Sequence, residues 1–262
     1  MSGKGDKTTV RYVMATIIAF CIVGVYGLFA LNLKIMNPLT QALKEYTITD
    51  FYYQVIGTSA ERDTSRLVTI VDMTELVDRR DIAYALQEVQ AQHPKVVGVD
   101  IKFEGLKPDN PEGDSLIAAV AANDTSTVFA LQYIDESFDG EQYTKVRQSF
   151  FADSIPHLKE ALANMPLDTH DGLRRQIILG KKVQGRMMPS MIKRISDEYA
   201  GQEIMPLKDK TMTINWAPIE FRVIPYDSIA EYGEYLTDRI VLFGAYADDI
   251  DMHLTPKGKI PG

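Results

Sequence analysis

The chain has 262 residues, of which 45% are hydrophobic and 24% are charged, as in globular proteins that bury a sizeable core. Its net charge of −8 argues against a nucleic-acid partner, because such partners are bound by basic surfaces. The single cysteine excludes a disulfide framework within the chain.

The first predicted element is a membrane-spanning helix at residues 12–33. This stretch reads YVMATIIAFCIVGVYGLFALNL and carries no charge. At 1.5 Å per residue it would form roughly 33 Å of helix, enough to cross the hydrocarbon core of a bilayer. A core helix would show a polar stripe, and a cleaved signal peptide would have a shorter apolar region and a small-x-small site. We therefore predict an uncleaved anchor whose partner is the lipid bilayer.

The charges beside this helix predict its orientation. Lys4, Lys7 and Arg11 precede it, whereas only Lys34 follows closely. Because cationic flanks stay in the cytoplasm, residues 1–11 are expected on the cytoplasmic side of the inner cell membrane. The chain after the helix is then expected on the outer side, in the periplasm.

The exterior part divides into a connector at 34–60 and a domain at 61–262. The net charge of the chain is −8 and the first eleven residues carry +2, so the remaining residues carry −10. Cys21 lies within the predicted membrane helix, which leaves the exterior without a thiol. Cysteine metal sites and cysteine nucleophiles are therefore excluded there.

Apolar strands alternate with amphipathic helices along the exterior domain. Strands are predicted at Leu67–Val71 and in KVVGVDIKF, STVFALQYI, TMTINWA and RIVLFGAYADD, and helices in DIAYALQEVQAQH, in NPEGDSLIAAVAAN and from Met188 to Ala200. This alternation favours parallel strands with right-handed crossovers. We predict an α/β fold: a largely parallel sheet with helices on both faces, a β-hairpin inserted around Asp171, and one transmembrane helix in front.

Sequence motifs for cofactors and common hydrolases are missing. No G-x-G-x-x-G follows a predicted strand, LGKKVQG lacks the spacing of a phosphate-binding loop, and no G-x-S-x-G is present. These absences argue against nucleotide binding and against a serine hydrolase of that type, and we predict no cofactor.

Asp72 and Thr74 follow the first strand in the segment IVDMTEL. An aspartyl nucleophile motif would need a second aspartate where Thr74 stands. The alternative interpretation is structural: Asp72 accepts hydrogen bonds from backbone amides of the loop, and Thr74 caps the helix that follows.

Asp248, Asp249, Asp251 and His253 form an acidic cluster after the last strand. Hard cations take several oxygen ligands, so these residues are weak candidates for a divalent metal site. Their spacing matches neither an EF-hand loop nor a zinc signature. A solvated acidic loop is the alternative.

Three aspartates are predicted at the carboxyl ends of strands: Asp72, Asp100 and Asp248. Ligands of open α/β sheets bind in the crevice at that edge. If the strands are neighbours, these carboxylates, together with Asp251, are candidates for a pocket that takes a cation, an amine or hydroxyl groups.

Two adjacent arginines stand out in the segment THDGLRRQII. Asp171 and Gly172 predict a tight turn, because glycine tolerates positive φ. In a strand after this turn, Arg174 and Arg175 would point to opposite faces and could not share a ligand. We interpret the four residues as a structural clamp in which one arginine pairs with a carboxylate of Asp100 or Asp251, with an anion site as the alternative.

The order of these features resembles the second family of CHASE domains, extracellular sensory modules associated with bacterial cyclases, histidine kinases and serine/threonine kinases. The resemblance covers residues 67–262 and rests on LVTIVDM, HPKVVGVDIKF, NPEGDSLIAAVA, VFALQY, HDGLRRQII, MPSMIKRI and RIVLFGAYADDIDMHLTP. Family members commonly carry a tryptophan-proline element and an arginine after the first strand. Here the segment reads TELVDRRDIAYAL, so Arg79 or Arg80 would replace that arginine and the aromatic is missing.

The resemblance implies a domain that senses an unknown small ligand or an envelope condition and signals across the membrane. It offers no catalytic set to carry over, so we predict no catalytic residues and no enzymatic activity. The family usually continues into further membrane helices and an output domain, so a chain ending at Gly262 is expected to be a fragment or to signal through a partner. A homodimer or a membrane signalling subunit are the candidate partners. The alternatives are a non-catalytic scaffold subunit of a membrane complex and a metal-dependent, membrane-tethered hydrolase.

Overall fold

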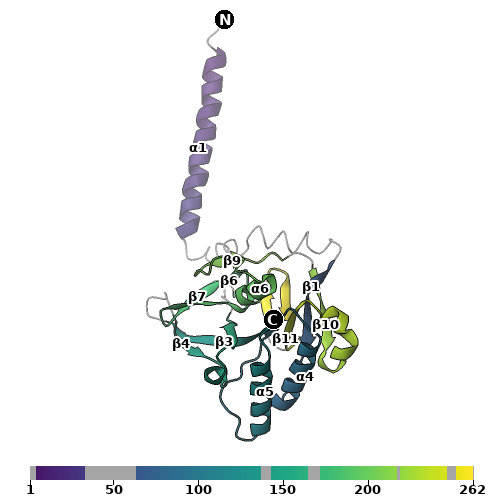
Figure 1. The fold of residues 1–262 in the computed structure, drawn as a ribbon. Coiled ribbons are helices and arrows are strands. Elements are labelled where there is room, and N and C mark those ends of the chain that lie inside the picture. Colours follow the sequence, from purple (N-terminus) through teal and green to yellow (C-terminus); the bar gives the residue numbers. More distant parts are fainter. Residues whose placement is uncertain are drawn as a thin grey trace. The chain divides into compact units, whose positions relative to one another are not determined.

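The computed structural model describes residues 4–32, 63–136, 143–164, 172–216, 219–246 and 252–261. The chain forms two compact units, Met1–Phe51 and Tyr52–Gly262. The described part of the first unit is one long helix, α1 (Lys4–Asn32; Figure 1). Its window Val10–Gly27 has a mean hydropathy of 1.8, and by length and composition it qualifies as a membrane anchor or a signal sequence. The predicted connector, residues 34–60, lies outside the described residues.

A nine-stranded, mostly parallel sheet forms the centre of the second unit (Figure 1). Its strand order is β10-β1-β11-β2-β3-β4-β7-β8, and β5 also pairs with β3. All pairs from β10 to β3 are parallel, and so is β3 with β5. The strands are β1 (Asp63–Asp72), β2 (Val96–Val99), β3 (Thr127–Glu136), β4 (Tyr143–Arg147), β5 (Lys159–Leu162), β7 (Gly180–Val183), β8 (Arg186–Pro189), β10 (Ile219–Pro225) and β11 (Ile240–Gly244).

Helices cover both faces of this sheet. Alternate residues of β2 show the division, because side chains of a strand alternate between faces. Val97 and Val99 belong to the main core, together with residues of α4 (Arg79–Ala91), α5 (Pro111–Asn123) and the 3-10 helix η3 (Tyr226–Tyr235). Val96 packs in a second core against Ile195 of α6 (Met191–Ala200). The predicted α/β fold with a largely parallel sheet is confirmed.

Each long helix of this unit begins at a side-chain cap. Asp78 accepts a bond from the Arg80 amide at the start of α4, Asn110 from Gly113 at the start of α5, and Ser190 from Lys193 at the start of α6. The suggestion that Thr74 caps the first of these helices is therefore wrong. Helix α6 also starts at Met191 rather than Met188, because the residues before Ser190 belong to β8.

Short strands lie outside the large sheet. β6 (Gln176–Ile178) pairs antiparallel with β9 (Thr211–Thr213), and β12 (Met252–Thr255) pairs with β13 (Gly258–Pro261). The hairpin β7–β8 turns at Gln184 and Gly185, which both have positive φ, as a two-residue hairpin turn requires. Asp171, where the hairpin was expected, lies outside the described residues.

Three phenylalanines tie the loops to the main core. Phe103 follows β2, Phe129 lies in β3, and Phe151 precedes the 3-10 turn η2 (Ala152–Ser154). Their ring centroids are 5.4–6.1 Å apart, mostly edge to face, and all three side chains are buried. Such aromatic pairs stabilise beyond their buried area, so this cluster fixes the loop that leaves β2.

Replacing Phe129 by alanine should lower the free energy of unfolding by about 3–5 kcal/mol, because it opens a cavity between the other two rings. The measurement is urea unfolding of the full chain in detergent, followed by circular dichroism. The control Tyr84→Ala changes an exposed ring of α4 and should alter stability by less than about 0.5 kcal/mol. Equal effects of the two variants would contradict the assignment of Phe129 to the core.

Candidate functional site

The carboxyl ends of β1, β11 and β2 form one continuous edge of the sheet. Asp72, the last residue of β1, lies opposite Gly244, the last residue of β11. Asp100 directly follows β2, and its amide donates to the carbonyl of Phe243 over 3.0 Å. The two carboxylates therefore flank β11, and the residue between them carries no side chain. The shared pocket was predicted only if these strands are neighbours, and β1, β11 and β2 are consecutive in the sheet.

The Asp72 carboxylate joins the loops that leave β1 and β11. Its Oδ1 accepts bonds from the amides of Thr74 and Tyr246, both 2.9 Å long, and from the Thr74 hydroxyl. The Thr74 hydroxyl oxygen also accepts from the Tyr246 amide, over 2.9 Å. This confirms the structural interpretation of Asp72 as an acceptor for backbone amides. All three bonds converge on one of its two oxygens.

Several predicted site residues lie outside the described part of the chain. Asp248, Asp249 and Asp251 fall in a segment that the structure does not describe, and of the metal candidates only His253 is placed, in β12. Within the described ranges, no three His, Cys, Asp or Glu side chains form a group that could hold a metal ion. The roles of the acidic cluster therefore stay predictions.

The arginine segment is held by backbone bonds on two sides. Gly172 has a φ of +71°, as its tight turn predicts. The Arg174 amide donates to Leu254 of β12 over 2.8 Å, and the Arg175 carbonyl accepts from Ile214 over 2.9 Å. The strand that was expected to contain both arginines begins only at Gln176. The side-chain clamp with Asp100 or Asp251 remains a prediction.

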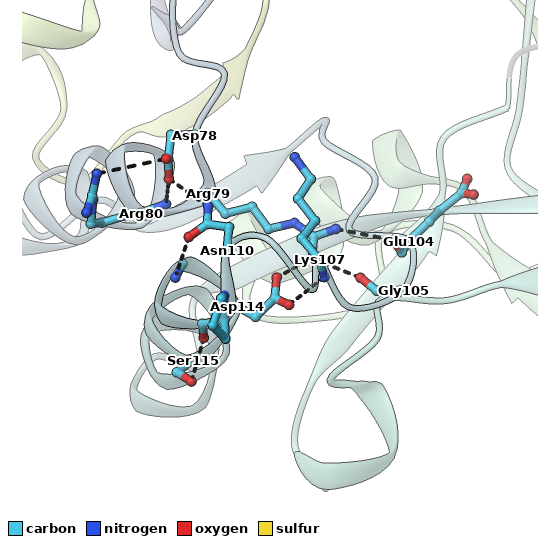
Figure 2. A network of polar contacts seen from close by, with 11 residues as sticks. Asp78, Arg79, Arg80, Glu104, Gly105, Lys107, Asn110, Asp114 and Ser115 are labelled. Atoms are coloured by element: carbon cyan, nitrogen blue, oxygen red, sulfur yellow. Dashed lines mark hydrogen bonds and ion pairs between the residues drawn. The ribbon is translucent and has the colours of Figure 1, made fainter.

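A buried ion pair, Arg79 with Asp114, braces the loop that follows Asp100 (Figure 2). The two residues are 4% and 5% exposed. Besides the carboxylate, the Arg79 guanidinium donates to the carbonyls of Gly105 at 2.8 Å and Glu104 at 3.2 Å. Asp114 in turn accepts from the Lys107 amide at 2.6 Å. The loop between β2 and α5 is thus hydrogen-bonded to both members of the charge pair, and buried charges require such partners.

A comparison with protein-family models matches residues 15–262 to the CHASE2 domain. The chain belongs to the CHASE2 family. CHASE2 domains are extracytoplasmic sensory domains and are generally non-catalytic. No curated protein and no solved structure matches the chain.

The structure decides which arginine is buried in this CHASE2 domain. Arg79 packs its guanidinium 4.9 Å from the ring centre of Phe150, whereas Arg80 lies on the surface among Asp78, Asp81 and Glu112. The periodicity of the helix already distinguishes the two. Arg79 is three residues before Ile82, on the apolar stripe of α4. Asp114 is likewise three residues before Ile117 on α5. Charged residues on both apolar stripes could have indicated a buried pair.

The starts of the two helices are also joined to each other. The Asn110 side-chain amide donates to the Asp78 carboxylate over 2.8 Å, and that carboxylate also accepts the Arg80 amide (Figure 2). The bond from the Arg80 amide, followed by the bond from Asn110, lowers the pKa of Asp78 below its ordinary value. Both bonds favour the ionised form, as expected for a cap near the positive end of a helix.

Removing the buried guanidinium with Arg79→Ala should cost about 3–5 kcal/mol of unfolding free energy, because Asp114 would be left buried and unpaired. Arg80→Ala is the matched control and should cost less than about 0.5 kcal/mol, because its ion pairs are exposed. The double variant Arg79→Met/Asp114→Leu should recover much of the loss. Urea unfolding checks all three, and similar costs for the two single variants would contradict the buried-pair assignment.

Asp78 should make stability depend on pH in the acid range. Its folded pKa is lowered, so its contribution is fully present above the pKa of the unfolded chain and is lost as the pH falls through the folded pKa. Asp78→Asn keeps a cap oxygen but cannot titrate. The difference in unfolding free energy between the wild type and this variant should therefore shrink on acidification. Asp81→Asn, in the same helical turn, is the control. A constant difference for Asp78→Asn would contradict the assignment.

Proposed function

We propose that the chain is a membrane-anchored receptor whose CHASE2 domain detects a small ligand at the carboxyl edge of β1, β11 and β2. The observation that carries this proposal is the placement of Asp72 and Asp100 on either side of Gly244. This edge is where open α/β sheets bind ligands. The carboxylates favour a cation, an amine or a polyhydroxylated compound. Asp248 and Asp251 follow β11 in the sequence and complete the candidate set.

Helix α1 would anchor the receptor in the cell membrane. The apolar window Val10–Gly27 supports a span, and the cations Lys4, Lys7 and Arg11 before it support a cytoplasmic N-terminus. This orientation places the domain outside the inner membrane, as for CHASE2 domains generally.

Strand β1 would connect the ligand edge with the membrane. Its first residue, Asp63, follows the connector from α1, and its last residue, Asp72, carries a candidate ligand carboxylate. Because Asp72 also holds the Tyr246 amide, a ligand that recruits this carboxylate would shift the loop after β11. Signalling by this route needs a ligand that binds the two loop arrangements with different affinity.

The test is thermal-shift screening of the full chain in detergent with amines, polyols and divalent cations. A ligand at this edge should raise the melting temperature of the wild type. Asp100→Asn should abolish that rise, because it removes the charge of an exposed carboxylate at this edge. The melting temperature without ligand should change little in this variant, since a surface substitution alters stability by less than about 0.5 kcal/mol.

Asp109→Asn is the matched control, because it removes an exposed carboxylate from the same loop, away from the strand end. It should keep the full ligand response. If Asp72→Asn and Asp100→Asn both keep every response, the proposed site is wrong. Stabilisation by divalent cations alone that persists in Asp72→Asn and Asp100→Asn would instead favour the hydrolase, and no response to any probe would favour the scaffold.

A further inference from the structure

Strand β10 forms one end of the sheet. Among the described residues, β10 lies at the end of the strand order beside β1 (Figure 1) and pairs with that strand alone, so one of its sides has no strand partner. Open edges of this kind can pair with another strand, and many proteins block them with prolines or charges. Here prolines stand at both ends, Pro218 and Pro225, and the stretch between them is Ile-Glu-Phe-Arg-Val-Ile.

The two faces of this strand differ in character. Ile224 is buried in the main core, and on the same face Arg222 stacks on the ring of Tyr235, 3.7 Å from its centre. Ile219, Phe221 and Val223 therefore point to the other face, and all three are exposed. Phe221 is 49% exposed. A row of apolar side chains on an open edge is typical of a protein–protein contact.

The sequence of this edge is complementary to itself. If two copies pair antiparallel with Phe221 opposite Phe221, Glu220 of each copy lies opposite Arg222 of the other. Ile219 then lies opposite Val223 on the apolar face. Directly opposed side chains in an antiparallel pair contact each other, and opposite charges there are stabilising.

Other antiparallel registers are unfavourable. Centring the pair on Glu220 places two carboxylates opposite each other, and centring it on Arg222 places two guanidinium groups opposite each other. A register shifted by one residue from the one centred on Phe221 places apolar residues opposite charged ones. Like charges directly opposite are destabilising, so the strand selects the register centred on Phe221.

We propose that β10 is a self-association edge through which two copies of this chain pair antiparallel about a two-fold axis at Phe221. The contact would join the two nine-stranded sheets into one. Such an interface is isologous, because each copy contributes the same residues. The prolines limit the added ladder to residues 219–224, since proline has no amide hydrogen to donate. This inference does not depend on the ligand site.

Disulfide cross-linking of the full chain in lipid nanodiscs tests the register. In a background with Cys21→Ser, Phe221→Cys places two thiols opposite each other across the axis and should form a disulfide dimer under mild oxidation. Leu106→Cys is the control, because it exposes a thiol in the loop between β2 and α5. Its cross-linking should be at least about fivefold lower, given the short reach that a disulfide demands.

Charge reversal tests the same register with Phe221 intact. Glu220→Arg and Arg222→Glu should each weaken dimer formation at least about fivefold in sedimentation experiments, because each creates two like-charge pairs. The double variant Glu220→Arg/Arg222→Glu should restore it. That variant also lacks the contact of Arg222 with Tyr235, so its recovery cannot come from this contact.

Three results would overturn the proposal. They are a monomeric wild-type chain, equal cross-linking at positions 221 and 106, and a double reversal that is no better than the single ones. A dimer held together only by α1 would give the second result.

Discussion

The buried pair of Arg79 and Asp114 is the interaction on which the candidate site depends. It fastens the start of α4 to the first turn of α5 and binds the loop between β2 and α5 through the carbonyls of Glu104 and Gly105. That loop begins at Asp100, so the same pair limits how far this carboxylate can move. A charge pair of this kind contributes little net stability compared with apolar residues of the same shape. Its value here is geometric, because it holds irregular backbone in one arrangement.

The strand order explains how distant parts of the sequence meet at one edge. β11, close to the end of the chain, lies between β1 and β2, which come from the beginning of the domain. Asp72 and Asp100 therefore do not lie on adjacent strands, because β11 runs between them and ends at Gly244. The loop after β11 is bonded to Asp72 through the Tyr246 amide. Any ligand that binds this edge would therefore act on segments from both halves of the domain.

Strand β1 connects the two proposed surfaces. The ligand edge lies at its carboxyl end, and the self-association edge lies on the neighbouring strand β10. A change at Asp72 would reach β10 across a single pair of strands. This arrangement offers a physical route by which ligand binding and pairing of two copies could influence each other, since both would act on the same strand.

The sequence determined features that depend on local patterns. The uncharged run at the N-terminus, the alternation of strands and helices, and the order of segments that resembles CHASE2 domains were all predicted from neighbouring residues, and the fold class and the family agree. The structural role of Asp72 was one of two interpretations that the sequence left open. These results follow from periodicity, which a helix or strand imposes over a few residues.

Only the tertiary structure decided the rest. The order of strands, the choice between Arg79 and Arg80, the late start of the strand at Gln176, and the strand β10 that sequence reasoning missed all depend on partners far along the chain. β6 pairs with β9, and β10 pairs with β1. The sequence pattern of a strand does not reveal which strand it pairs with. Local periodicity specifies which side of an element is apolar. Which element covers that side is set by packing and by satisfaction of buried polar groups, and both are properties of the folded chain.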